Sequence, residues 1–230
     1  MTHPPHGTPE APRLAVRGEA RLEVDPEVAR LDITVSARGT DRHDALAQLT
    51  RRNNATLELV RSYEDAVHKL ETGAFSLTPE LSRHGRTERV RAYHGRVHLT
   101  AHLTDFTALG DLTTRLAENE LTRLGGPWWD LHLDSPAHRE ARRQAVHEAV
   151  QRAREYAEAL GTTLDSLLEL ADIGAETPAP QPGFGRAARG ARRALGGNAE
   201  EEPAPLDLEP QRQTVHAQVN ARFTLHPPRL

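Results

Sequence analysis

Apolar and polar residues alternate with a period of two in four stretches of the chain, a pattern typical of strands with one buried face. The clearest is residues 97–103, in which Val97, Leu99, Ala101 and Leu103 share one side and polar residues the other. The other three stretches are residues 14–24, 29–37 and 215–225. Asp25 and Pro26 separate the first two along the chain, and this turn signal predicts that they form a hairpin.

Shorter apolar patterns predict three more strands, at residues 70–77, 127–133 and 167–173. Pro79 is expected to end the first of these, because proline cannot donate to a strand ladder. A polar turn is expected over residues 83–89, and Pro127 is expected to open the second strand.

Helical spacing of apolar residues predicts a helix capped by Asp41 that runs to about Tyr63, and a second helix that follows Asp105. A third and longer helix is predicted after Ser135 and Pro136, which occupy N-cap and first-turn positions, and Gly161 marks its end.

The third helix has an unusual buried face. It carries an alanine at every fourth position, which places all five on one ridge: Ala141, Ala145, Ala149, Ala153 and Ala157. Residues four apart lie above one another on a helix. A ridge of such small side chains lets the helix axis approach a flat surface, so we expect this helix to pack closely against a β-sheet.

Composition narrows the function classes. Hydrophobic residues make up 37% of the 230 residues and aromatic residues only 4%, so the core must be aliphatic and rich in alanine. The formal charge of −4 gives no reason to expect a nucleic acid or an anionic membrane as a partner. The absence of cysteine excludes disulfides and thiolate catalysis.

No apolar run is long enough to span a membrane, and the N-terminus does not resemble a secretory signal, so a cytoplasmic location is expected.

We expect one domain over residues 13–226, with a disordered tail at residues 1–12 and a short tail at 227–230. Residues 175–205 are rich in Pro, Gly, Arg and Glu, and we expect them to form a flexible loop that interrupts this domain. The alternation at residues 215–225 indicates that the chain returns to the sheet after the loop. The predicted fold class is α+β, with mostly antiparallel sheet packed on the long alanine-rich helix and on two shorter helices.

This order of elements resembles the SIMPL domain family, also called domain of unknown function 541. The similar stretches are Gly18-Glu19-Ala20 leading into Val24-Asp25-Pro26, Tyr93 leading into Val97-His98-Leu99, Asp105-Phe106, the alanine ridge with Leu160-Gly161, and Val215 to Val219 with Phe223. The resemblance covers residues 14 to 225. Bacterial members include periplasmic immunogenic proteins and proteins linked to oxidative-stress defence. The resemblance implies an α+β fold and large ring-like homo-oligomers, and it implies no catalytic residue.

Three histidines, His94, His98 and His102, are spaced by four residues, which on a helix would suggest a metal-binding face. They lie in a predicted strand, where four residues span about 13 Å. Neighbouring members of the set therefore cannot share an ion, although His132 could approach one of them across the sheet. We expect a solvated polar face and no metal site.

The adjacent Trp128 and Trp129 should face opposite sides of their strand. One is expected to pack inside, and the other could serve an interface, although packing in the core or at a sheet edge is the favoured interpretation. Asp134, Ser135 and His138 invite comparison with a hydrolase triad, but at a helix N-terminus they are expected to cap the helix.

The segment 183–197 is basic, with Arg186, Arg189, Arg192 and Arg193, and it is followed at once by the acidic run Glu200 to Glu202. It resembles a weak nucleic-acid tether, yet Phe184 is its one stacking aromatic. A solvated linker is the favoured interpretation, so nucleic acid is not an expected partner.

The sequence thus predicts a non-enzymatic SIMPL-type protein that acts as a self-assembling scaffold or a stress-associated binding module of unknown ligand. It predicts no catalytic residue and no cofactor; the expected partners are other copies of the chain and a protein partner. One alternative is nucleic-acid or protein binding through residues 183–197. A weaker alternative is an unrecognised enzyme or a His-dependent metal-binding protein.

Overall fold

A computed structural model describes residues 7–84, 87–172 and 206–228. Within these ranges the chain has three helices and seven strands, and the strands form two antiparallel sheets. This confirms the predicted α+β class. The described residues divide into two compact units. Unit 1 contains β1 (Arg13–Val24), α3 (Pro136–Ala159), β6 (Leu164–Asp172) and β7 (Gln213–Leu225). That residues 13–226 act as one domain stays a prediction, and the loop predicted at 175–205 lies outside the described residues.

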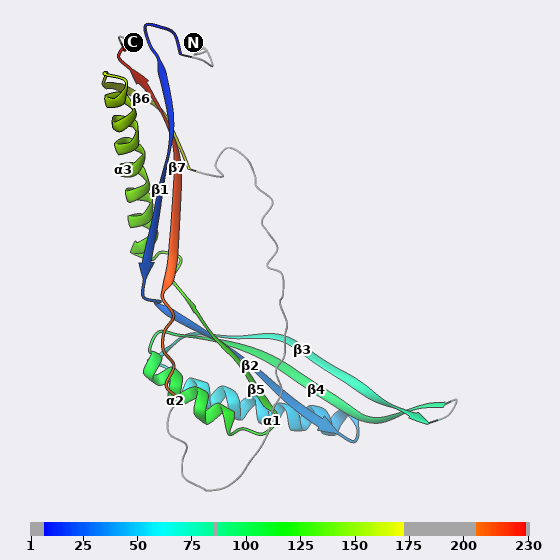
Figure 1. Cartoon of the computed structure of the whole chain (residues 1–230). Coiled ribbons are helices and arrows are strands. Elements are labelled where there is room, and N and C mark those ends of the chain that lie inside the picture. Colours follow the sequence, from blue (N-terminus) through cyan, green and yellow to red (C-terminus); the bar gives the residue numbers. More distant parts are fainter. Residues whose placement is uncertain (1–6, 85–86, 173–205, 229–230) are drawn as a thin grey trace. The chain divides into compact units, whose positions relative to one another are not determined.

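Unit 2 contains β2 (Val28–Gly39), α1 (Arg42–Arg61), β3 (Val67–His84), β4 (Thr87–Leu103), α2 (Phe106–Ala117) and β5 (Thr122–Asp130). Its sheet has the order β3-β4-β2-β5 (Figure 1). Helix α1 joins β2 to β3 across β4, and α2 joins β4 to β5 across β2. This is the split β-α-β arrangement of ferredoxin-like folds.

Both helices of unit 2 cover the same face of the sheet, because the apolar residues of β2 and β4 point to that face. The aliphatic core is built from Leu31, Ile33 and Leu99 of the strands and from Leu49 and Leu112 of the helices, all at most 1% exposed. The predicted caps are confirmed: Asp41 accepts a hydrogen bond from the Asp44 backbone N–H, and Asp105 accepts from the Ala108 N–H. These caps satisfy backbone donors that a helix cannot satisfy itself.

In unit 1 the sheet has the order β1-β7-β6, and α3 packs on it (Figure 1). All five alanines of the ridge are buried, as predicted. The ridge meets β1 at Gly18, where an added Cβ atom would lie 2.0 Å from the Ala145 carbonyl oxygen and 2.7 Å from the Ala149 Cβ atom. The close approach of helix and sheet therefore needs small residues on both sides.

The predicted end of α3 is also confirmed. Gly161 has a φ of 67°, the left-handed conformation that glycine adopts readily. Its N–H donates to the Glu158 carbonyl, and the Thr162 N–H donates to the Ala157 carbonyl. These two bonds are those of a Schellman motif, which satisfies carbonyls at the end of the helix.

Strand β7 pairs with β6 in the sheet that α3 covers, which confirms that the chain returns to this sheet after residue 205.

Just before β7, residues 206–208 lie on α2 of unit 2. The Leu206 N–H donates to Thr114 Oγ1 at 2.9 Å, and Leu208 packs against the core. An added Cβ atom at Gly110 would lie 2.4 Å from the Leu206 carbonyl oxygen, so glycine is what lets this segment lie flat on the helix.

Three expectations about the strands are wrong. Strands β1 and β2 do not form a hairpin, because they belong to different sheets. Strand β3 does not end at Pro79: Pro79 pairs with Tyr93, and the ladder to β4 continues to His84 and Thr87, so the predicted turn at 83–89 is mostly strand. Strand β5 begins at Thr122 and not at Pro127.

Proline is tolerated at position 79 because β3 is an edge strand of its sheet, where a missing N–H can face away from the neighbouring strand. In the described ranges, no helix combines the length and the apolar character that crossing a bilayer would need.

Candidate functional site

The exposed face of the sheet in unit 2 carries most of the candidate residues. His94, His98 and His102 lie on β4 and alternate with residues of the buried face. Their Cα partners on β2 are Arg38, Thr34 and Arg30 in turn. The strand placement predicted for the three histidines is confirmed, and each has its own set of neighbours.

His94 belongs to a small polar cluster at the surface. Its Nε2 atom lies 2.7 Å from Glu80 Oε2, which also accepts a hydrogen bond from Arg38 Nη2 at 3.0 Å. The hydrogen bond from His94, followed by that from Arg38, holds the pKa of Glu80 below its usual value. This cluster links three strands, and all three groups are exposed enough that we ascribe little stability to it.

The other two histidines have different surroundings. His98 Nδ1 lies 3.4 Å from Thr34 Oγ1, and its Nε2 lies 3.8 Å from Asp32 Oδ1. Burial, followed by the positive charge of Lys69, lowers the pKa of His102.

His132 lies beside His68, edge to face, with ring centroids 5.4 Å apart. No group of three or more His, Cys, Asp or Glu side chains that could hold a metal ion occurs among the residues that the structure describes. That the protein needs no metal stays a prediction.

The two tryptophans face opposite sides of β5, as predicted. Trp129 packs on the core with its ring edge to face against Phe106, at a centroid distance of 4.8 Å. Trp128 is 43% exposed, and the Arg30 guanidinium lies over its ring at 4.7 Å. This pair is an exposed cation–π contact on the open face of the sheet.

Ser135 serves as the N-cap of α3. It is 4% exposed, and its Oγ accepts a hydrogen bond from the Ala137 N–H at 3.3 Å. This confirms the capping interpretation, and the absence of a hydrolase triad at Asp134, Ser135 and His138 stays a prediction. The basic segment 183–197 lies outside the described residues.

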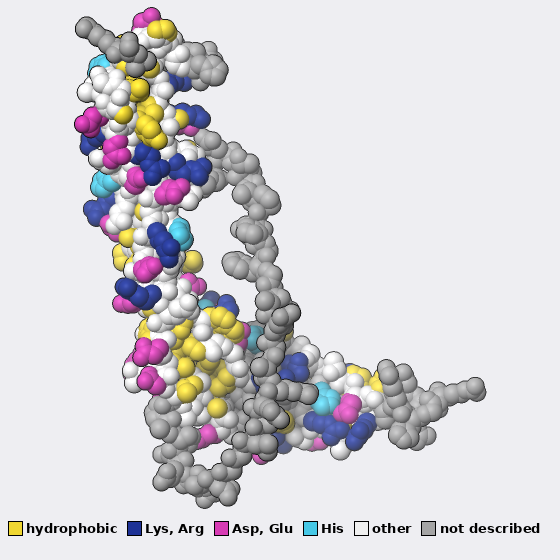
Figure 2. All heavy atoms as spheres, viewed as in Figure 1, with side chains coloured by type: hydrophobic (Ala, Val, Ile, Leu, Met, Phe, Trp, Pro, Cys, Tyr) yellow, Lys and Arg dark blue, Asp and Glu magenta, His cyan; other side chains and the backbone are white. Residues whose placement is uncertain are grey.

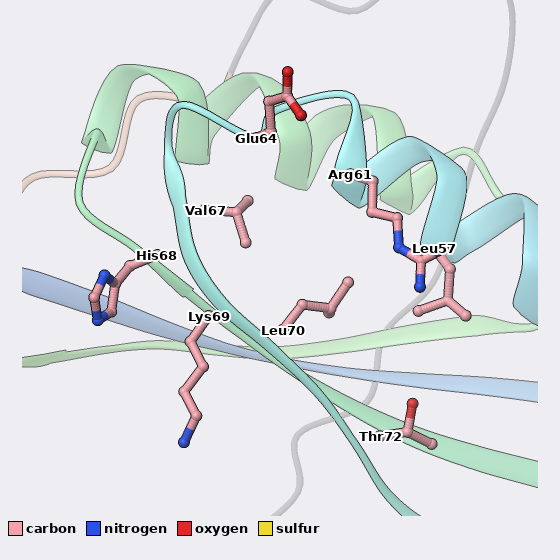
Figure 3. A pocket seen from close by; sticks show the side chains of 8 residues that line it. All are labelled: Leu57, Arg61, Glu64, Val67, His68, Lys69, Leu70 and Thr72. Carbon is pink, nitrogen blue, oxygen red and sulfur yellow. The ribbon is translucent and has the colours of Figure 1, made fainter.

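A groove that the sequence did not reveal lies between the C-terminal half of α1 and the first half of β3 (Figure 3). It has a volume of about 350 Å³. Its apolar part consists of Leu57 from α1 with Val67 and Leu70 from β3, all half-buried. Arg61 follows Leu57 by one turn on α1 and reaches down beside it toward the same space (Figure 3).

The other polar residues around the groove are turned elsewhere. In Figure 3 Glu64 lies on the loop above the groove, while His68 and Lys69 point to the opposite side of β3. Lys69 forms an ion pair with Glu71 at 2.9 Å. Arg61 is therefore the cation that faces the apolar side chains.

The groove could not be predicted because each of its residues fits a common pattern in the sequence. Leu57 fits the apolar face of α1, and an exposed arginine in the last turn of a helix is common. The one available signal was the spacing of Leu57 and Arg61, which places an apolar and a cationic side chain on the same helix face just before a strand.

The chain is similar to two curated proteins, both named "26 kDa periplasmic immunogenic protein". One is from Brucella melitensis biotype 1 (strain 16M) and the other from Brucella abortus (strain S19). Each is 24% identical over 211 residues, which cover 86% of this chain and 80% of the relative. Among solved structures, a putative amidohydrolase/peptidase from Burkholderia cenocepacia is 17% identical over 65% of this chain and 34% of that one. Its TM-score of 0.23 is too low to bear on fold or function.

The sequence model of the SIMPL family, described as "Protein of unknown function (DUF541)", matches residues 14–223, which include every helix and all but the ends of the first and last strands. The chain therefore belongs to the SIMPL family.

Proposed function

We propose that this protein is a non-enzymatic member of its family that assembles with copies of itself and serves as a scaffold or a binding module. The observation that carries the proposal is the apolar edge strand of unit 1. Strand β6 lies at the edge of its sheet, and Leu167, Leu168 and Leu170 are 54%, 38% and 46% exposed. An edge strand offers unpaired backbone groups, and exposed leucines beside them favour association.

Two of these leucines lie on the face of the sheet that α3 covers only in part. Leu167 is paired with Phe223 and Leu170 with Ala221, both of which point toward α3. The helix packs on β1 and β7, and β6 lies at its margin. Tyr156 and Leu160 near the end of α3 are also exposed, and Figure 2 shows hydrophobic side chains on this unit. A second copy that covered this apolar margin would remove it from water.

The leucines of β6 provide a direct test of assembly. We expect the wild-type chain to have a native mass of at least twice the 25.4 kDa of one chain, and we expect the double variant Leu167→Lys/Leu170→Lys to shift toward the monomer. Two charges placed in an apolar contact must be desolvated, which disfavours the contact. Native mass spectrometry and light scattering, both over a range of protein concentrations, measure the change.

Leu133→Lys is the matched control, because Leu133 is fully exposed in unit 1 and lies outside β6. It should leave the native mass unchanged. A wild-type chain that is monomeric at high concentration would contradict the proposed assembly. A double variant of unchanged mass would exclude β6 as its surface.

The non-enzymatic role, the stress association and the cytoplasmic location are further parts of the proposal. The relatives are named periplasmic proteins, so fractionation of the native host distinguishes the two compartments. Catalysis by purified protein on a panel of hydrolase substrates would contradict the non-enzymatic role. Binding of nucleic acid or protein through residues 183–197 remains the second candidate, and deleting that segment tests it through the salt dependence of binding.

A further inference from the structure

The groove of Figure 3 exists because α1 does not cover the edge of its own sheet. The helix packs chiefly on β2 and β4 and makes much less contact with β3. Val67 and Leu70 point toward the helix layer, since their Cα partners Leu103 and Ala101 are buried core residues. Both are half-buried and line the groove. The result is a small apolar floor beside α1.

One cation faces this floor. Within the described residues no carboxylate lies within 4.0 Å of the Arg61 guanidinium. Glu64, the acidic side chain that also borders the groove, sits on the loop above it (Figure 3). An arginine with unused donors beside an apolar surface matches a ligand that has an acidic head and an apolar body, because guanidinium binds carboxylate through two parallel hydrogen bonds.

The irregular shape of edge strand β3 argues against an added peptide strand as the ligand of the groove. The ladder between β3 and β4 is irregular between Val67 and Lys69 and again between Thr72 and Phe75. Bulges of this kind, together with a lysine such as Lys69, are devices that block the addition of a further strand. Recognition must then come from the side chains of the groove. A volume of about 350 Å³ is at the lower end of ligand-binding clefts, so the ligand is small.

We propose that this groove binds a small aliphatic carboxylate, with its carboxylate on Arg61 and its hydrocarbon chain on Leu57, Val67 and Leu70. The bond to Arg61 fixes the head, and the apolar floor selects for chain length. This site is independent of the assembly surface on β6, which belongs to the other unit.

The probe for the test is octanoate, used below its micelle concentration with the full chain. Titration followed by NMR should shift the methyl signals of Leu57, Val67 and Leu70 in a saturable manner. Octanoate should bind at least about tenfold more tightly than butanoate, because it has four more methylene groups and the burial of two of them already accounts for that ratio. 1-Octanol, which has the chain without the charge, should bind about tenfold more weakly than octanoate.

Arg61→Gln should weaken octanoate about tenfold or more and leave 1-octanol unaffected. Arg51→Gln, which removes the same charge from an exposed position of α1 outside the groove, should bind octanoate as the wild type does. Any one of three results would overturn the proposal: no saturable shift at the three groove residues, equal affinity of octanoate and 1-octanol, or equal octanoate affinity in the Arg61→Gln and Arg51→Gln variants.

Discussion

Replacing Gly18 by alanine is expected to lower the free energy of unfolding by about 3 kcal/mol, the upper range for overpacking a core. The added Cβ atom would lie 2.0 Å from the Ala145 carbonyl oxygen and 2.6 Å from the Ala149 backbone nitrogen. Both atoms belong to the backbone of α3, so no side chain can rotate away. The helix must move off β1, and the buried alanines around the contact then lose their packing. Urea denaturation followed by far-UV circular dichroism measures the loss.

Gly73→Ala is the control for this variant. Gly73 is exposed on β3, and an added Cβ atom there would find its nearest neighbour, His98 Cδ2, at 3.4 Å, an ordinary contact. The free energy of unfolding of the Gly73→Ala variant should differ from that of the wild type by less than about 0.5 kcal/mol, or be slightly higher, since alanine restricts the unfolded chain. Equal losses in the two variants would show that the contact between Gly18 and α3 is not tight in solution.

The same experiment tests whether the chain unfolds as one domain. Both tryptophans lie in unit 2 and Gly18 lies in unit 1. If residues 13–226 unfold together, Gly18→Ala shifts the tryptophan fluorescence transition and the circular dichroism transition equally. If the fluorescence transition stays in place, the units unfold independently.

The sequence pattern was sufficient for most elements and for their caps. Alternation identified β2, β4 and β7 because one face of each strand is buried and the other is polar. The alanine ridge of α3 and the glycine after it predicted the close packing and the end of that helix. These features depend on neighbours in the sequence, which a pattern records directly.

Pairing between strands was harder to predict. The turn signal at Asp25 and Pro26 is the same whether the chain folds back on itself or enters a second sheet, so the expected hairpin of β1 and β2 was wrong. Pro79 was assigned as a strand end because the sequence does not show that β3 is an edge strand. The groove at Arg61 depends on the same kind of information, since it forms where α1 leaves the edge of the sheet uncovered.

The two tryptophans of β5 should differ strongly in their contributions to stability. Trp129→Ala is expected to cost about 3 kcal/mol of unfolding free energy, because it removes the ring that packs on Phe106 and leaves a cavity at the core. Trp128→Ala should cost less than about 1 kcal/mol, because Trp128 is 43% exposed and loses mainly a surface contact with Arg30. Each variant is the other's control, and urea denaturation followed by circular dichroism gives both values.

Comparing Trp128→Ala with Trp129→Ala also tests whether the open face of the sheet in unit 2 is covered in solution. An isolated chain leaves Trp128 in contact with water, so a small effect is what the described fold requires. A cost for Trp128→Ala as large as that for Trp129→Ala would mean that Trp128 is covered in solution. If that cost also rises with protein concentration, another copy covers it, because stability gained from association follows mass action. The sheet face, and not β6 alone, would then belong to the assembly surface.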